Sequence, residues 1–229
     1  MSVPTVRPHT VRARELVLAA TSPALPMAMA AQMAVLLAFL LVWGGGVPTM
    51  TGATVLDQLV VIHGVGLLIV MPWALARAVP LDSQESLGLL ALLTGRSTTG
   101  IVGARLVAMF LVLVAVALAG LPLLVIGQQM AMAPTGTVAW AMGAGLVLGA
   151  LVSAVGCLWA LSGLDRMRVW LGTSLSVWLA AGIAGRIWPA GATGLLALAA
   201  VLVVGWLVLR VRGDASARER HPQHASGSR

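Results

Sequence analysis

Long apolar runs separated by short polar segments dominate the chain. Six runs predict membrane-spanning helices, at about 26–43, 57–76, 101–127, 138–162, 169–187 and 192–209. An apolar helix of about 20 residues crosses a hydrocarbon core of about 30 Å. The runs are continuous, without the alternation of a barrel strand, and a helix satisfies its own backbone hydrogen bonds in lipid. We therefore expect an all-α, polytopic membrane protein with six transmembrane helices in one domain over residues 11–212.

The segments outside the runs predict the remaining organisation. Residues 1–10 are polar and contain proline, and the tail over 213–229 is rich in Arg, Ser and His, so we expect both to be disordered. Residues 10–22 mix arginines with a Leu-Val-Leu stretch, which favours an N-terminal interfacial helix over an ordinary charged flank. Gly120 and Pro122 predict a bend within the third run.

Composition supports a membrane protein. Apolar residues make up 59% of the 229 positions and charged residues only 9%, whereas a soluble domain carries about 25% charged residues. So few charges cannot cover a surface that faces water. The lipid bilayer is therefore the first expected partner.

The arginines predict the orientation of the spans. The net charge is +7, and every basic residue is an arginine. With six spans, thirteen of the fourteen fall on one side of the membrane and only Arg186 falls on the other. Positive residues collect on the cytoplasmic side, so we expect a protein of the inner (cytoplasmic) membrane with both termini in the cytoplasm. Because membrane orientation explains these arginines, we expect no nucleic-acid partner.

Motifs of enzymes and metal sites are missing from the sequence. A chain without lysine cannot form the G-x-x-x-x-G-K-[ST] loop of a P-loop ATPase, and neither H-E-x-x-H nor G-x-S-x-G occurs. The single cysteine, Cys157, lies in an apolar run and is expected to be a packing residue. We expect no catalytic site, no metal site and no cofactor bound by this chain.

His63 is the one histidine inside a predicted span. An ionisable residue within the membrane is a candidate functional residue. The interpretation we favour is a neutral imidazole that is hydrogen-bonded between helices. The alternative is a substrate path, in which His63 lines the mouth with Asp57 and Gln128.

A G-x-x-x-G pattern lies in the fourth predicted span. Gly145 and Gly149 form it, and Ser153 extends it by one further turn. Small residues at this spacing let helices approach closely. We interpret the three residues as packing positions inside the bundle.

The connection after the second span predicts a short helix over 82–95 that is not long enough to cross the membrane. Asp82 or Ser83 can cap it, and Gly95 can end it. Its leucines Leu89, Leu92 and Leu93 share one stripe that must be buried. The residues alone are compatible with two arrangements, namely packing on the protein's own bundle or at the interface, and docking on a cytoplasmic partner.

The stretch from Glu85 to Leu106 resembles the signature region of type-2 ABC transporter permeases. In that family a leucine-rich helix ends in a Leu-Leu-x-Thr-Pro-x-Ser-like turn, and a hydrophobic pair and a basic residue then open the third span. Here the turn reads Leu-Leu-Thr-Gly-Arg-Ser over 92–97, with Gly95 in place of the proline, and Ile-Val-Gly-Ala-Arg-Leu follows over 101–106. The end of the fourth span, followed by Asp165 to Arg168, is similar to the family's helix that ends in a basic turn.

The resemblance implies an ATP-driven exporter. Two permease subunits, identical or different, would pair, and each would bind a separate cytoplasmic ABC ATPase subunit that holds ATP and Mg²⁺. The residues implied in ATPase coupling are Glu85, Leu89, Leu92, Leu93, Thr94 and Arg96, with a second cytoplasmic contact at Asp165, Arg166 and Arg168. A permease for haem export or cofactor maturation has the same build. Two further classes of function compete with transport: a membrane anchoring or assembly protein and, less favoured, an intramembrane enzyme.

Overall fold

The described part of the chain is helical throughout. The computed structural model describes residue 17 and residues 21–44, 52–78, 97–133, 136–162, 164–187 and 199–206. Its helices are α2 (Ala24–Gly44), α3 (Gly52–Ala78), α5 (Thr98–Ala119), α6 (Leu121–Ala131), α7 (Gly136–Leu161) and α8 (Arg166–Ile187). Residues 199–206 are also helical, and no strand occurs within these ranges. The all-α prediction is confirmed.

Five segments are long and apolar enough to cross a membrane. They are Ala24–Val42, Thr54–Ala78, Thr98–Ala131, Gly136–Leu161 and Arg166–Ala184, and each coincides with one of the first five predicted spans. The chain is therefore a multi-pass membrane protein. Of the sixth predicted span only 199–206 is described, and the predicted helix over 82–95 lies outside the described residues.

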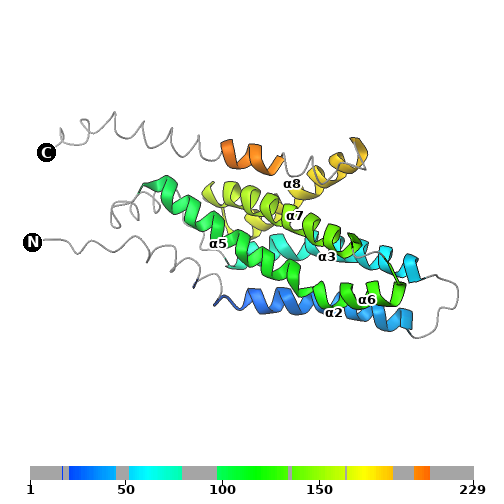
Figure 1. Ribbon diagram of the computed structural model, residues 1–229. Coiled ribbons are helices and arrows are strands. Elements are labelled where there is room, and N and C mark those ends of the chain that lie inside the picture. The colour runs from blue at the N-terminus through cyan, green and yellow to red at the C-terminus, as the bar shows by residue number, and fades with distance from the viewer. Residues whose placement is uncertain are drawn as a thin grey trace, which may run out of the picture.

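Helix α3 is the centre of the bundle, because it contacts each of the other named helices. Figure 1 shows it in cyan, with α2 and α6 on one side and α7 on the other. Leu59, Leu67, Met71 and Leu75 of α3 are almost completely buried. Large apolar side chains such as Leu41 of α2 remain exposed, as expected for helices that face lipid.

The third predicted span is interrupted at Gly120, where α5 ends and α6 begins. Pro122 lacks an amide hydrogen, and its ring would clash with the carbonyl group of Leu118 in a continuous helix. The regular hydrogen-bond pattern changes just before this proline, where the amide of Gly120 donates to the carbonyl oxygen of Ala117, three residues earlier, at 3.4 Å. The third span is thus interrupted at the position where the sequence predicts a bend, and α6 continues along the bundle beyond it (Figure 1).

The segment that follows α7 differs from its prediction. The sequence suggests a charged turn over 165–168, but α8 already begins at Arg166. The side chain of Asp165 accepts a hydrogen bond from the amide of Arg168 at 2.8 Å, which satisfies one of the free amides at the helix start. The carboxylate also pairs with the guanidinium group of Arg168 at 3.6 Å, and both side chains are exposed. Arg166 and Arg168 are therefore residues of the first helical turn.

The G-x-x-x-G residues of α7 are buried in the bundle. A Cβ atom added at Gly145 would lie 3.3 Å from Cδ1 of Leu67 on α3, and one added at Gly149 would lie 3.5 Å from Cβ of Leu113 on α5. The hydroxyl group of Ser153 donates to the carbonyl oxygen of Gly149 at 2.7 Å. These positions bring α7 close to α3 and α5.

Candidate functional site

His63 of α3 forms a buried hydrogen-bonded contact with α2. The side-chain amide nitrogen Nε2 of Gln32 donates to Nδ1 of His63 at 2.9 Å. The same nitrogen donates to the backbone carbonyl oxygen of His63 at 3.2 Å. His63 is 1% exposed and Gln32 is completely buried. The pair therefore joins the first two spans inside the bundle.

Two glycines make room for this pair. Gly66 lies three residues after His63, on the same face of α3. A Cβ atom at Gly66 would come within 2.6 Å of Oε1 of Gln32. A Cβ atom at Gly120, where α5 meets α6, would come within 2.6 Å of Nδ1 of His63. Because Gly120 also lies at the break in the third span, α2, α3 and the α5–α6 junction meet at the imidazole.

The hydrogen bond selects one form of the His63 ring. An amide NH₂ group can only donate, so Nδ1 must accept, and the neutral ring carries its proton on Nε2. Within the described part of the chain, His63 Nε2 and Gln32 Oε1 are buried without a hydrogen-bond partner. The ring thus retains one free N–H donor, while its other nitrogen holds α2.

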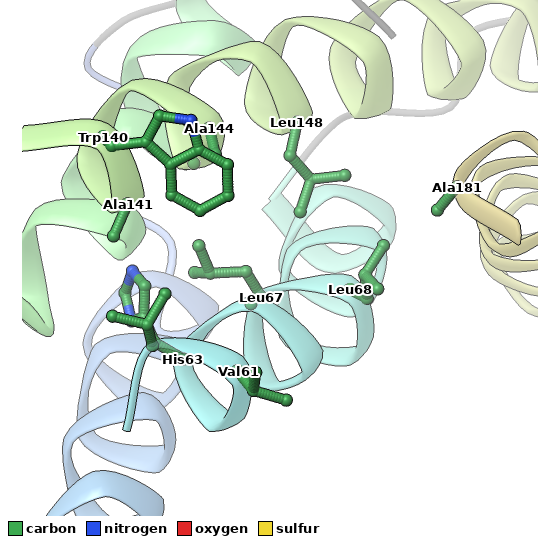
Figure 2. A pocket seen from close by; sticks show the side chains of 12 residues that line it. Val61, His63, Leu67, Leu68, Trp140, Ala141, Ala144, Leu148 and Ala181 are labelled. Carbon is green, nitrogen blue, oxygen red and sulfur yellow. The ribbon is translucent and has the colours of Figure 1, made fainter. Parts of the chain in front are cut away.

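His63 also lines an apolar cavity of about 260 Å³. Figure 2 shows Trp140, Ala141, Ala144 and Leu148 of α7 above His63 and Leu67 of α3, with Ala181 of α8 at the far side. Small residues leave this space open: a Cβ atom at Gly64 would meet no atom within 4 Å. The complete lining is Val60, Val61, His63, Gly64, Leu67, Leu68, Trp140, Ala141, Ala144, Gly145, Leu148 and Ala181.

This arrangement favours binding over catalysis. Ligand pockets typically enclose roughly 300–1,000 Å³ and have apolar walls with a few polar groups, so this cavity is suited to a small apolar group. The described residues contain no group of three or more His, Cys, Asp or Glu side chains that could hold a metal ion. The described part of the site therefore offers an apolar surface, with the buried imidazole of His63 in its wall.

The structure separates the three residues predicted for a substrate path. His63 lines the cavity, but Asp57 and Gln128 do not. Asp57 is exposed on α3, and Gln128 is partly buried on α6. Their predicted role with His63 stays a prediction.

The residues predicted for ATPase contacts are described only in part. Glu85, Leu89, Leu92, Leu93, Thr94 and Arg96 lie outside the described residues. Asp165 and Arg168 form the exposed pair at the start of α8. Arg166 lines a separate pocket with Arg77.

Gln32 is the partner of His63 that sequence reasoning missed. A glutamine within an apolar run is a recognisable signal, because a polar side chain in a span needs a partner. Comparison of the chain with protein-family models, curated proteins and solved structures gives no match.

Proposed function

We propose that this chain is the membrane-spanning permease subunit of an ATP-driven ABC exporter. In this proposal it has six spans with both termini in the cytoplasm, lies in the inner membrane, and pairs with a second permease subunit. A separate cytoplasmic ATPase subunit supplies ATP hydrolysis. The observation that carries the proposal is the resemblance of residues 85–106 to the signature region of type-2 permeases.

The arrangement of the helix ends supports this proposal. Helix α3 ends at Ala78 and α5 begins after Ser97, so both ends of the connection that contains the predicted coupling helix are described. Arg77 near the end of α3 and Arg166 at the start of α8 line the same pocket. The end of α3, from which the chain leads to 85–96, and the start of α8 therefore lie at the same end of the bundle.

The central position of α3 suggests how motion would be transmitted. In the proposal, the helix over 82–95 docks on the ATPase through Leu89, Leu92 and Leu93, assisted by the other coupling residues Glu85, Thr94 and Arg96. Asp165, Arg166 and Arg168 form a second contact. Because α3 contacts each of the other named helices, displacement of its end at Ala78 would be transmitted to each of these helices. Packed interiors transmit such displacement because they are dense and barely compressible.

The cavity beside His63 supports an apolar cargo. Its walls are almost entirely apolar. A small hydrophobic molecule matches this lining. Asp57 and Gln128 would lie on the approach from the outer side.

Copurification with an ATPase tests the coupling. The full chain is captured from its native membranes after solubilisation in detergent, and the ABC ATPase that copurifies with it is quantified. The Leu89→Asp/Leu93→Asp variant is expected to lose about tenfold or more of the bound ATPase, because it places two charges in the docking stripe. Leu87→Asp is the matched control, since position 87 falls on the opposite side of a helix over 82–95 and should retain the ATPase.

Two outcomes would contradict the proposal. Equal recovery of the ATPase with the double variant and with the wild-type chain would show that the leucine stripe is not the contact. Failure of the wild-type chain to retain any ATPase would contradict the proposed function itself.

A further inference from the structure

Two arginines and two tryptophans line a pocket at one end of the bundle. The pocket lies between the C-terminal end of α3 and the first turns of α8, and encloses about 440 Å³. Its lining is Trp73, Ala76, Arg77, Arg166, Met167 and Trp170. The volume falls within the roughly 300–1,000 Å³ that is typical of ligand sites.

The charge of this pocket is not neutralised by the described part of the chain. Within those residues no ion pair involves Arg77 or Arg166. The neighbouring carboxylate of Asp165 is engaged by Arg168. Both arginine side chains are exposed, and an anion bound between two positive groups is attracted by both. The pocket therefore favours an anionic ligand, and arginine is well suited to phosphate because its guanidinium group donates two parallel hydrogen bonds.

The two tryptophans add a hydrogen-bond donor to the pocket and indicate how deep the pocket lies in the membrane. The indole nitrogen Nε1 of Trp170 is buried and has no hydrogen-bond partner among the described residues. Tryptophan is enriched where a membrane protein meets the headgroup layer. Trp73 and Trp170 flank the arginines at the ends of two apolar spans, so the pocket lies at the depth of lipid phosphates. The apolar surface of Ala76 and Met167 is suited to the glycerol and the first methylenes of a lipid.

We propose that this pocket binds the phosphate headgroup of an anionic phospholipid. Arg77 and Arg166 hold the phosphate, and the indole N–H of Trp170 supplies a third donor. Basic pockets between transmembrane helices on the cytoplasmic side suit such headgroups, and this is the side on which the arginine distribution places both residues. A zwitterionic lipid carries the same phosphate, but its ammonium group would be repelled by the second arginine. Arg166 is also one of the residues implied in the second ATPase contact, but the lipid site is tested on the chain without an ATPase, so its failure and the failure of the export function are distinguishable.

Lipid titration of the purified full chain tests the site. The protein in neutral detergent receives phosphatidylglycerol, phosphatidylcholine or inorganic phosphate, and bound lipid is counted by native mass spectrometry while thermal stability is recorded. The Arg77→Gln/Arg166→Gln variant removes both charges. Arg186→Gln is the matched control, because Arg186 is an exposed arginine at the opposite end of α8. The Arg77→Lys/Arg166→Lys variant keeps the charge and serves as a second test if the glutamine variant does not fold.

The expected result is a preference for phosphatidylglycerol over phosphatidylcholine of about tenfold or more, weakened by salt. The glutamine variant should lose this preference, whereas Arg186→Gln and the lysine variant should keep it. Equal binding of the two lipids, or an unchanged preference in the glutamine variant, would overturn the proposal. Stabilisation by inorganic phosphate that depends on the same arginines and displaces phosphatidylglycerol would overturn the lipid as ligand and identify a site for free phosphate.

Discussion

At the scale of single residues, the Gln32–His63 pair links the first two spans. The Gln32 amide makes two hydrogen bonds to the same residue of α3, one to the imidazole at 2.9 Å and one to the backbone at 3.2 Å. Hydrogen bonds between membrane helices contribute about 0.6 kcal/mol on average and up to about 1.7 kcal/mol. The pair is buried and lies beside Gly66 and Gly120, so we expect its contribution in the upper part of that range.

A double-mutant cycle measures this contribution. His63→Leu leaves Gln32 with its backbone bond only, whereas Gln32→Leu removes both bonds, and both replacements keep a similar side-chain volume. We expect each single variant to lower the free energy of unfolding, and the double variant to lose less than the sum, with a coupling energy of about 1 kcal/mol. Unfolding in mixed micelles of SDS and a mild detergent gives all four values. A coupling energy of zero would show that the side-chain hydrogen bond does not stabilise the bundle.

The sequence identified His63 but not Gln32 as a candidate residue, for a physical reason. His63 is conspicuous because it is an ionisable residue in an apolar run. Gln32 is uncharged, and the direction in which it points depends on how α2 is rotated against α3. That rotation is set by close packing, here by Leu36 and Gly66. A helix that is apolar around its whole circumference has no polar face, so its sequence does not predict the rotation.

At the scale of helices, glycine controls how closely α7 and α8 approach. A Cβ atom added at Gly172 of α8 would lie 2.7 Å from two atoms of the Trp159 indole on α7. That indole is held in place by a hydrogen bond from its Nε1 to the hydroxyl group of Ser176, at 3.3 Å. Gly182, on the same helix, would place a Cβ atom in open space.

These two glycines give a matched comparison. Alanine is about 0.8–1.0 kcal/mol more favourable than glycine within a helix, so Gly182→Ala should be neutral or stabilising. Gly172→Ala adds the same preference, but overpacking against Trp159 costs about 1–3 kcal/mol. We expect Gly172→Ala to be the less stable variant by about that amount when the free energies of unfolding are compared in detergent. Equal stability of the two variants would contradict the close approach of the helices.

Helix positions were predictable to the extent that hydropathy determines them. The first five apolar runs coincide with helices, because burial of the backbone in lipid requires a helix wherever a run is long enough. The ends were predicted less well. Helix α8 starts at Arg166, three residues before the predicted span, because Asp165 caps it and polar residues in a first turn can remain at the membrane surface. Hydropathy does not detect such turns.

At the scale of the whole molecule, two arginines that the sequence predicts on the same side of the membrane lie at the same end of the bundle. Arg77 and Arg166, which the sequence assigns to the cytoplasmic side, line one pocket although they are far apart in the chain. The predicted coupling helix is attached at the same end, between α3 and α5. A membrane bundle without lysine cannot form a P-loop of its own. In the proposed exporter, this end is where a separate ATPase would act.

The rate of ATP hydrolysis in proteoliposomes tests the central proposal most directly. The full chain is reconstituted alone and together with the ABC ATPase that copurifies with it. We predict no hydrolysis above empty liposomes for the chain alone, and hydrolysis by the complex that depends on the lysine of the ATPase phosphate-binding loop and is lost with Leu89→Asp/Leu93→Asp. Hydrolysis by the chain alone, or an ATPase whose rate and membrane attachment do not depend on the chain, would contradict the assignment as a permease subunit.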